Sequence, residues 1–347
     1  MRGAAASASL RASMVRTRLP VLLLVTPYLA DANNGNWRTA ARWARLLAPH
    51  YRVIVQAPSA PVRGGRIDDA VALLALHARR SHEAIAAWRD QRGERALVVT
   101  LTGTDLYKDL PAGDAAALRS ISLADRLVVL QDDAPSHLPA AFRAKSRVVF
   151  QSARSLLPWP GKRADRLHCI LVAHLREEKD PATAFAAWRS LPKDIPATLT
   201  IVGAALDPAL GRAARDLAAA DARVQWLGPR EHAWTRQAIK RAHLLVVPSR
   251  MEGGANVVVE AITAGTAVVG SRMSGNLGML GRDYPGYFEP ADAKGLASLI
   301  TRIHENRALL ADLSARCRAR APLFEPEAEA LALRQVIGEA LRTRIEA

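Results

Sequence analysis

The sequence predicts an α/β protein made of two doubly wound, Rossmann-like domains with parallel sheets. The chain has 347 residues, half of them apolar, which is enough for two domains of ordinary size. Short apolar runs rich in β-branched residues alternate with segments of helical periodicity along the whole chain. Between the two series, residues 151–166 carry two prolines, a glycine and several cations without an apolar period, which is typical of a linker.

These patterns divide the chain into five segments. We expect a disordered extension at 1–18, a first domain at 19–150, a linker at 151–166, a second domain at 167–325 and a terminal helix at 326–347. Residues 1–18 are rich in Ala, Ser and Arg, like a targeting peptide. The apolar core that follows, 21–25, is too short for a secretory signal and suits a first buried strand, and Met14 is an alternative start.

In the first half, six apolar runs predict the strands of one sheet, at 21–26, 51–56, 71–76, 97–101, 127–130 and 148–150. The spacing of Ala40, Trp43, Ala44 and Leu47 predicts the first helix, and further helical segments lie near 81–92 and 112–123.

The second half repeats this alternation. Strands are expected at 167–173, 198–202, 224–227, 243–248 and 266–270, with helices near 207–220, 231–241 and 292–319. Asp180 before Pro181 predicts a capped helix start, residues 261–264 read as helix, and 326–345 is an amphipathic segment. The stretch 274–278 is expected to be a turn, either facing a donor sugar or forming a plain loop.

Polar residues follow several predicted strands of the first half, where strand ends of one parallel sheet converge. Such groups share one wall of a crevice, which predicts an acceptor-binding surface. Its candidates are Gly35, Asn36, Arg38, His77, Arg79, Arg80, Thr102, Gly103, Thr104, Asp105 and Lys108. Each has an ordinary alternative: His77 as a buried imidazole, Arg79 and Arg80 as a solvated helix start, and 102–107 as a plain turn.

The stretch from Ser249 to Glu260 predicts a phosphate-binding turn between a buried strand and a helix. Gly253 and Gly254 would allow a ligand to approach the backbone, and the amides of residues 254–256 would face an anion at the helix start. Glu252 and Glu260 flank the turn and suit vicinal hydroxyls better than phosphates. Together they fit a nucleotide sugar, although two glycines beside acids are by themselves more often only a turn.

The composition of the chain limits the partners, cofactors and compartment that we expect for this protein. The formal charge of +15 suits nucleic acid, an anionic membrane or anionic small substrates, but aromatics are only 5%, so base-stacking platforms are lacking and nucleic acid is not expected. Cys169 and Cys317 cannot form a disulfide framework, which favours a reducing cytoplasm. Histidines lack metal-ligand spacing, so neither metal nor cofactor is expected, and no stretch is long enough for membrane insertion.

The Glu-x7-Glu frame, preceded by Val-Pro-Ser and followed by residues 261–270, resembles the nucleotide-binding motif of retaining glycosyltransferases of family 4. This resemblance implies the two-domain GT-B fold, with donor and acceptor bound on facing domains across a cleft. A narrower resemblance rests on blocks that lie between residues 21 and 325, at 34–36, 39–47, 75–81, 101–111, 173–181, 249–256 and 283–288. In these blocks the chain is similar to the selenosugar synthases of selenoneine biosynthesis.

This resemblance implies transfer of N-acetylglucosamine from its UDP donor (UDP-GlcNAc) to selenophosphate. Lys179 would contact the donor diphosphate, and His174 stands where the family usually has arginine, which leaves Arg176 or Arg250 as the second cation. The implied catalytic residues are Lys179, Glu252, Arg176 and Asp105. The implied donor-binding residues are His174, Arg250, Gly253, Gly254, Ala255, Asn256 and Glu260.

Two alternatives stay open at this point. A family 4 enzyme with another sugar, lipid or small acceptor would have the same donor site, and a nucleotide-sugar-binding protein without activity would share it as well. The sequence also leaves open the anomeric configuration of the product, the oligomeric state and any protein partner.

Overall fold

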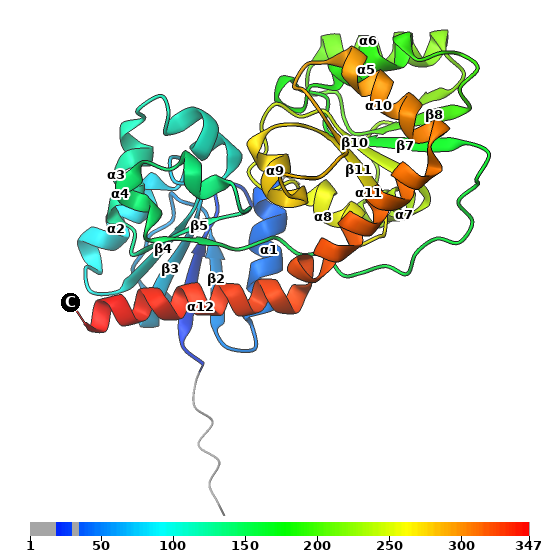
Figure 1. The fold of residues 1–347 in the computed structure, drawn as a ribbon. Coiled ribbons are helices and arrows are strands. Elements are labelled where there is room, and N and C mark those ends of the chain that lie inside the picture. Colours follow the sequence, from blue (N-terminus) through cyan, green and yellow to red (C-terminus); the bar gives the residue numbers. More distant parts are fainter. Residues whose placement is uncertain (1–18, 30–34, 347) are drawn as a thin grey trace, which may run out of the picture.

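The computed structural model describes residues 19–29 and 35–346. The predicted extension at 1–18 lies outside the described residues, as does the part of the first turn at 31–34. Two doubly wound domains follow one another along the chain, each with a parallel sheet between helices (Figure 1). The predicted fold class is confirmed.

The first sheet has the strand order β2-β1-β3-β4-β5-β6, with every neighbouring pair parallel. Helices cover both faces, so the central strands are apolar on both sides rather than alternating. In β1 all five residues are buried. The strands are β1 (Val21–Val25), β2 (Arg52–Gln56), β3 (Ala70–Leu76), β4 (Ala96–Thr100), β5 (Arg126–Val129) and β6 (Ser146–Val148).

Two helix pairs enclose this sheet. Helices α2 (His82–Gln91) and α3 (Ala115–Leu123) pack on one face through Trp88 and Ile121, and α1 (Gly35–Leu47) and α12 (Pro326–Ile345) pack on the other. Shorter elements connect the strands: η2 (Gly65–Asp69), the π-helical turn η3 (Asp105–Asp109), η4 (Ala134–His137) and α4 (Ala140–Arg143).

The second sheet has the order β12-β11-β10-β7-β8-β9, again parallel. Its strands are β7 (Leu167–Val172), β8 (Ala197–Val202), β9 (Val224–Trp226), β10 (Leu244–Val247), β11 (Ala267–Ser271) and β12 (Tyr287–Phe288). The elements around it are η5 (Glu177–Lys179), α5 (Pro181–Ser190), α6 (Pro208–Ala220), α7 (His232–Arg241), α8 (Asn256–Ile262), α9 (Ser274–Leu280), α10 (Ala293–Glu305), α11 (Arg307–Arg320) and η6 (Ala321–Phe324).

Helix α12 leaves the second domain and runs along the first (Figure 1). Its buried residues Leu333, Val336, Ile337 and Ala340 join the cluster formed by α1 and one face of the first sheet. The amphipathic segment at 326–345 therefore completes the core of the domain made earliest in the chain.

Several local predictions need correction. The strand expected at 148–150 is β6, which ends at Val148, and the expected turn at 274–278 is the start of helix α9. Helix α8 begins at Asn256, which agrees with the expected helix start at residues 254–256. Helices near 292–319 were expected, and the structure divides this stretch between α10 and α11 at Asn306, whose side chain accepts hydrogen bonds from the first amides of α11.

Asp180 stands at the predicted helix start but caps it differently. Its backbone is left-handed, with φ of 43°, and its carboxylate makes no bond to the helix amides. Instead it accepts hydrogen bonds from the hydroxyl of Thr183 and from Nε of Arg250. The side chain thus ties the turn after β7 to the turn after β10.

Among the residues that the structure describes, no helix combines the length and the apolar character that crossing a bilayer requires.

Candidate functional site

The two domains meet at turns that follow the carboxyl ends of their central strands. Gly103 follows β4 in the first domain, and Gly253 follows β10 in the second. A Cβ atom on Gly253 would lie 2.4 Å from the backbone nitrogen of Gly103, and one on Gly254 would lie 2.6 Å from Cβ of Leu130. In this structure the first domain occupies the space beside both glycines. Close domain contact is therefore a physical reason for glycine here, besides the predicted approach of a ligand.

Lys179 and Glu252 form an ion pair beside this contact. Nζ of Lys179 lies 2.5 Å from Oε1 of Glu252, and the hydroxyl of Ser249 donates to the same oxygen at 2.7 Å. The backbone amide of Arg250 bonds to the carbonyl of Glu178, which holds the two turns together. The lysine side chain keeps 21% of its surface exposed, against 8% for the glutamate. The geometry therefore places a solvent-accessible cation next to the turn.

Glu260 makes the second acid–base contact of this region. It lies on α8 and is buried, and its Oε1 is 2.6 Å from Nε2 of His232 at the start of α7. The His232 side chain is 50% exposed. Sequence reasoning missed this histidine, because residue 232 lies in a different turn and its spacing to residue 260 has no helical or strand period.

The other predicted cations of the second domain are engaged in ion pairs. Arg176 lies 3.7 Å from Glu178, while Nε of Arg250 bonds to Asp180 at 3.1 Å. His174 accepts a hydrogen bond from the amide of Ala204. Partial burial lowers the pKa of His174, and the neighbouring Arg176, Arg38 and Lys179 lower it further. The imidazole is therefore neutral at pH 7 and does not replace the charge of an arginine.

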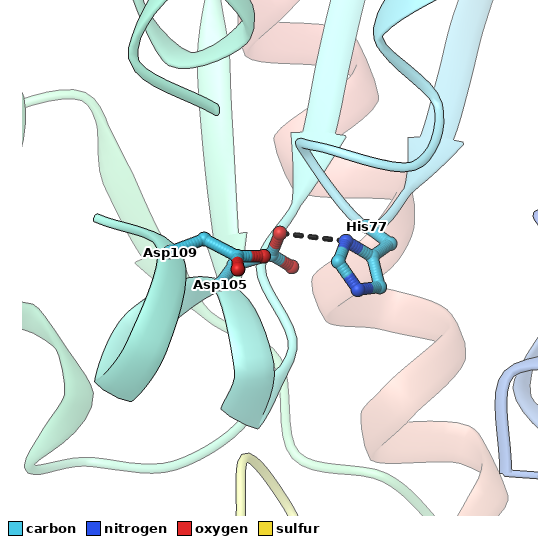
Figure 2. Close-up of side chains that lie close together, drawn as sticks. All are labelled: His77, Asp105 and Asp109. Carbon is cyan, nitrogen blue, oxygen red and sulfur yellow. Dashed lines mark ion pairs between the residues drawn. The ribbon is translucent and has the colours of Figure 1, made fainter. Parts of the chain in front are cut away.

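In the first domain, His77, Arg79, Asp105 and Asp109 bind one another. Nδ1 of His77 lies 2.7 Å from Oδ1 of Asp105 (Figure 2). Nε of Arg79 lies 2.9 Å from Oδ2 of Asp109. The other oxygen of Asp105 accepts from the amide and the hydroxyl of Thr102. Asp105 is fully buried. This burial favours a positioning role for Asp105 over the direct catalytic role expected from the sequence.

The same cluster has the composition of a metal site. One ligand atom from each of His77, Asp105 and Asp109 lies within 4.8 Å of the others. However, the Asp105 carboxylate already accepts hydrogen bonds at both oxygens, and the guanidinium of Arg79 is paired with Asp109. A metal ion would have to displace these donors, so the residues fit a hydrogen-bonded network better than a cation site.

The remaining predicted residues of the first domain are arranged around this network. Gly35 begins α1, and a Cβ atom on it would lie 4.0 Å from the side-chain nitrogen of Asn256, so the start of α1 approaches the turn of the second domain. Asn36 follows in the same turn of α1. Arg80 places its guanidinium 5.2 Å from the ring centre of Tyr28, whereas Lys108 is exposed and Thr104 half-buried.

A hydrogen-bonded trio joins the domains near η3. The hydroxyl of Tyr107 lies 3.0 Å from that of Ser274, at the start of α9, and Nε2 of Gln131 donates to Tyr107 at 3.0 Å. Burial raises the pKa of Tyr107 above its usual value. Gln131 was not predicted, and no local pattern distinguishes it from other polar residues that end a strand.

A separate pocket of about 540 Å³ lies between α7 and strands β7, β8 and β9. His168, Thr200, Gln225 and Trp234 contribute to its lining. It contains none of the predicted site residues.

Comparison with known proteins identifies the class. Residues 159–322 match the family described as Glycosyl transferases group 1. This match covers most of the second domain, and the whole chain has the GT-B fold of solved glycosyltransferases. A search of curated proteins finds no significant match.

Several solved structures are similar to this chain over most of its length. Sucrose-phosphate synthase from Thermosynechococcus elongatus is 19% identical, with a TM-score of 0.74 over 94% of this chain and 100% of that one. HepE from Anabaena, solved with UDP and glucose, is 16% identical, with a TM-score of 0.70 over 91% and 99%. The pneumococcal O-GlcNAc transferase GtfA, solved with UDP and GlcNAc, is 18% identical, with a TM-score of 0.64 over 78% and 57%. At these identities the likeness shows the fold.

Proposed function

We propose that this protein is a retaining-type glycosyltransferase that transfers N-acetylglucosamine from UDP-GlcNAc to selenophosphate. The observation that carries the transferase assignment is the Lys179–Glu252 ion pair, held beside a Gly-Gly turn where the strand ends of both sheets meet. The acceptor assignment rests on the resemblance of sequence blocks between residues 21 and 325 to selenosugar synthases.

The donor is proposed to bind to the second domain. Lys179 exchanges Glu252 for the donor diphosphate and, with the amides of Gly254 and Ala255, stabilises the charge that develops on the departing UDP. Glu252 then accepts hydrogen bonds from the sugar hydroxyls, and Glu260 from the ribose. The UDP complexes of HepE and GtfA, which share the fold, support a uridine donor.

The acceptor is proposed to bind to the first domain, near His77. The described residues leave Nε2 of His77 without a hydrogen-bond partner, while Asp105 fixes the other ring nitrogen. Such an imidazole can donate to or accept from a small anion. Arg79 and Arg80 supply positive charge close to it in sequence, and Lys108 precedes Asp109, the ion-pair partner of Arg79.

The reaction is a group transfer at the anomeric carbon. The bond from that carbon to the diphosphate oxygen breaks, and UDP leaves with the electron pair. A selenium lone pair of selenophosphate forms the new carbon–selenium bond. The nucleophile is already anionic, so a strong general base is not required, and closure of the two domains excludes the water that would hydrolyse the donor.

The direct test is to incubate the purified protein with UDP-GlcNAc and selenophosphate while following UDP release and product mass. A product that contains both N-acetylglucosamine and selenium is expected, and the Lys179→Ala variant should abolish it. UDP release only with another acceptor would favour a different family 4 activity. Donor binding without turnover under any acceptor would favour a nucleotide-sugar-binding protein.

A further inference from the structure

Arg42 reaches the turn of the second domain from the first. It lies on α1, and its Nη1 is 3.4 Å from the side-chain oxygen of Asn256, the first residue of α8. Its Nε donates to both carboxylate oxygens of Glu329, at 2.8 and 3.1 Å. The terminal Nη2 is buried and has no hydrogen-bond partner within the described part of the chain.

Glu329 holds this arginine in place. It lies on α12 and is only 1% exposed. Besides Arg42, it accepts hydrogen bonds from the indole of Trp43 at 2.5 Å and from the amide of Ser152 at 2.9 Å, and the Ser152 hydroxyl also donates to it. Because the carboxylate also binds Trp43 and Ser152, the long side chain of Arg42 is ordered by the fold rather than by a ligand, which lowers the entropy cost of binding.

Glu329 binds Arg42 through Nε, so it does not use the two terminal nitrogens of the guanidinium. A carboxylate commonly takes two parallel N–H groups of arginine, including a terminal nitrogen. Here Glu329 takes Nε alone, so Nη1 and Nη2 remain for another acceptor. Of the arginines that the structure describes with a buried unpaired nitrogen, Arg42 is the one in which that nitrogen is terminal.

We infer that Arg42 is an oxyanion-binding residue of the proposed transferase site, contributed across the domain boundary and oriented by Glu329. The inference rests on the proposed function. Arg42 and Asn256 belong to different domains, so hinge opening separates them and frees both terminal nitrogens for a phosphate group. That phosphate belongs either to the donor diphosphate or to the anionic acceptor. With His174 neutral, Arg42 takes the role of the second cation.

The test compares Arg42→Met with Arg45→Met, a matched control on the same helix. Arg45 is exposed, and its side chain bonds only to the carbonyl of Ala41 in its own helix. If Arg42 binds the diphosphate, Arg42→Met should weaken UDP binding, measured by calorimetry, about tenfold or more and leave uridine binding unchanged. The conservative variant Arg42→Lys should then restore part of the lost UDP affinity. If Arg42 binds the acceptor, UDP affinity is kept and the KM for selenophosphate rises by a similar factor.

Arg42→Met leaves the buried Glu329 carboxylate without its cation, so the variant can lose stability. The double variant Arg42→Met/Glu329→Gln removes both charges and is measured in parallel, with a thermal melt as the folding control. The inference is overturned if the folded variants match Arg45→Met in UDP affinity and acceptor KM, or if UDP and uridine binding weaken equally.

The proposed function can fail separately. A wild-type protein that neither binds UDP nor turns over would refute it. In that case pyrophosphate alone is the probe: stabilisation of the wild-type melting temperature that Arg42→Met loses and Arg45→Met keeps would still support Arg42 as an oxyanion ligand. Equal stabilisation of both variants would reject it.

Discussion

The two turns that face each other across the domain boundary differ in how their charges are satisfied. In the first domain, Asp105 and Asp109 are buried and receive hydrogen bonds from His77, Thr102 and Arg79 of the same domain. In the second, Glu252 and Glu260 each pair with a base, and those bases keep 21% and 50% of their side-chain surface exposed. The first turn is thus a rigid support, and the second can exchange its partners for a ligand.

The sharpest test of this contrast is Lys179→Ala. If Lys179 stabilises the leaving diphosphate, kcat should fall by about 10²–10³-fold, because one preorganised charge contact to the transition state is lost. The fold should be retained, but some loss of melting temperature is expected, because Glu252, which is only 8% exposed, loses its cation. Steady-state kinetics and a thermal melt measure both effects. The control variant is Lys294→Ala, because Lys294 is an exposed lysine of the same domain. Unchanged kcat/KM in Lys179→Ala would remove this residue from the mechanism.

Asp105→Asn addresses the rigid side of the comparison. It removes the charge that Nδ1 of His77 contacts and replaces an acceptor oxygen by a donor facing Thr102 or Arg79. A loss of about 2–4 kcal/mol in unfolding free energy is expected, together with lower activity. Urea denaturation measures the first quantity. Asp109→Asn, whose partner Arg79 is 38% exposed, should cost clearly less, and equal losses would contradict the distinction.

Glu260→Ala should weaken nucleotide binding without affecting the fold. Loss of its hydrogen bonds to a ribose diol is expected to raise the UDP dissociation constant about tenfold. His232→Ala should have a smaller effect, because it frees the carboxylate from its present partner but leaves it in place. Calorimetry with UDP compares the two, and an unaltered UDP affinity in Glu260→Ala would refute the ribose contact.

Tyr107→Phe should produce the smallest change. It removes the hydroxyl contact to Ser274 between the domains, worth about 1 kcal/mol, so a few-fold increase in donor hydrolysis relative to transfer is expected. Because burial raises the pKa of Tyr107, its hydroxyl stays protonated from about pH 6 to pH 9 and the ratio should not vary with pH in either protein. A pH-dependent difference would instead indicate proton transfer by the tyrosine.

Much of the architecture follows from local patterns, because a strand buried on both faces needs a continuous apolar run such as 21–25. Element ends were harder to predict. Asn306 divides one long helical pattern through a single side-chain cap, and the short helix α9 begins in a stretch that contains two glycines. Both features depend on a few hydrogen bonds rather than on periodicity.

The candidate site could likewise be predicted from the sequence only in part. Lys179, Glu252 and Glu260 were named from sequence, yet their pairing partners depend on the fold. Asp105 was expected to face a substrate, but a turn at a strand end can fold onto its own carboxylate, and composition does not reveal this. The contact between Arg42 and Glu329 joins residues 287 positions apart, for which a single sequence contains no signal.

The return of α12 to the first sheet also determines the order in which the protein can be completed during synthesis. Strands β1 to β6 leave the ribosome first, but α1 alone covers one face of their sheet until Leu333, Val336, Ile337 and Ala340 of α12 have been translated. The nascent first domain therefore exposes the apolar surface that α12 will cover while the entire second domain is being made, and it is prone to aggregate during that interval.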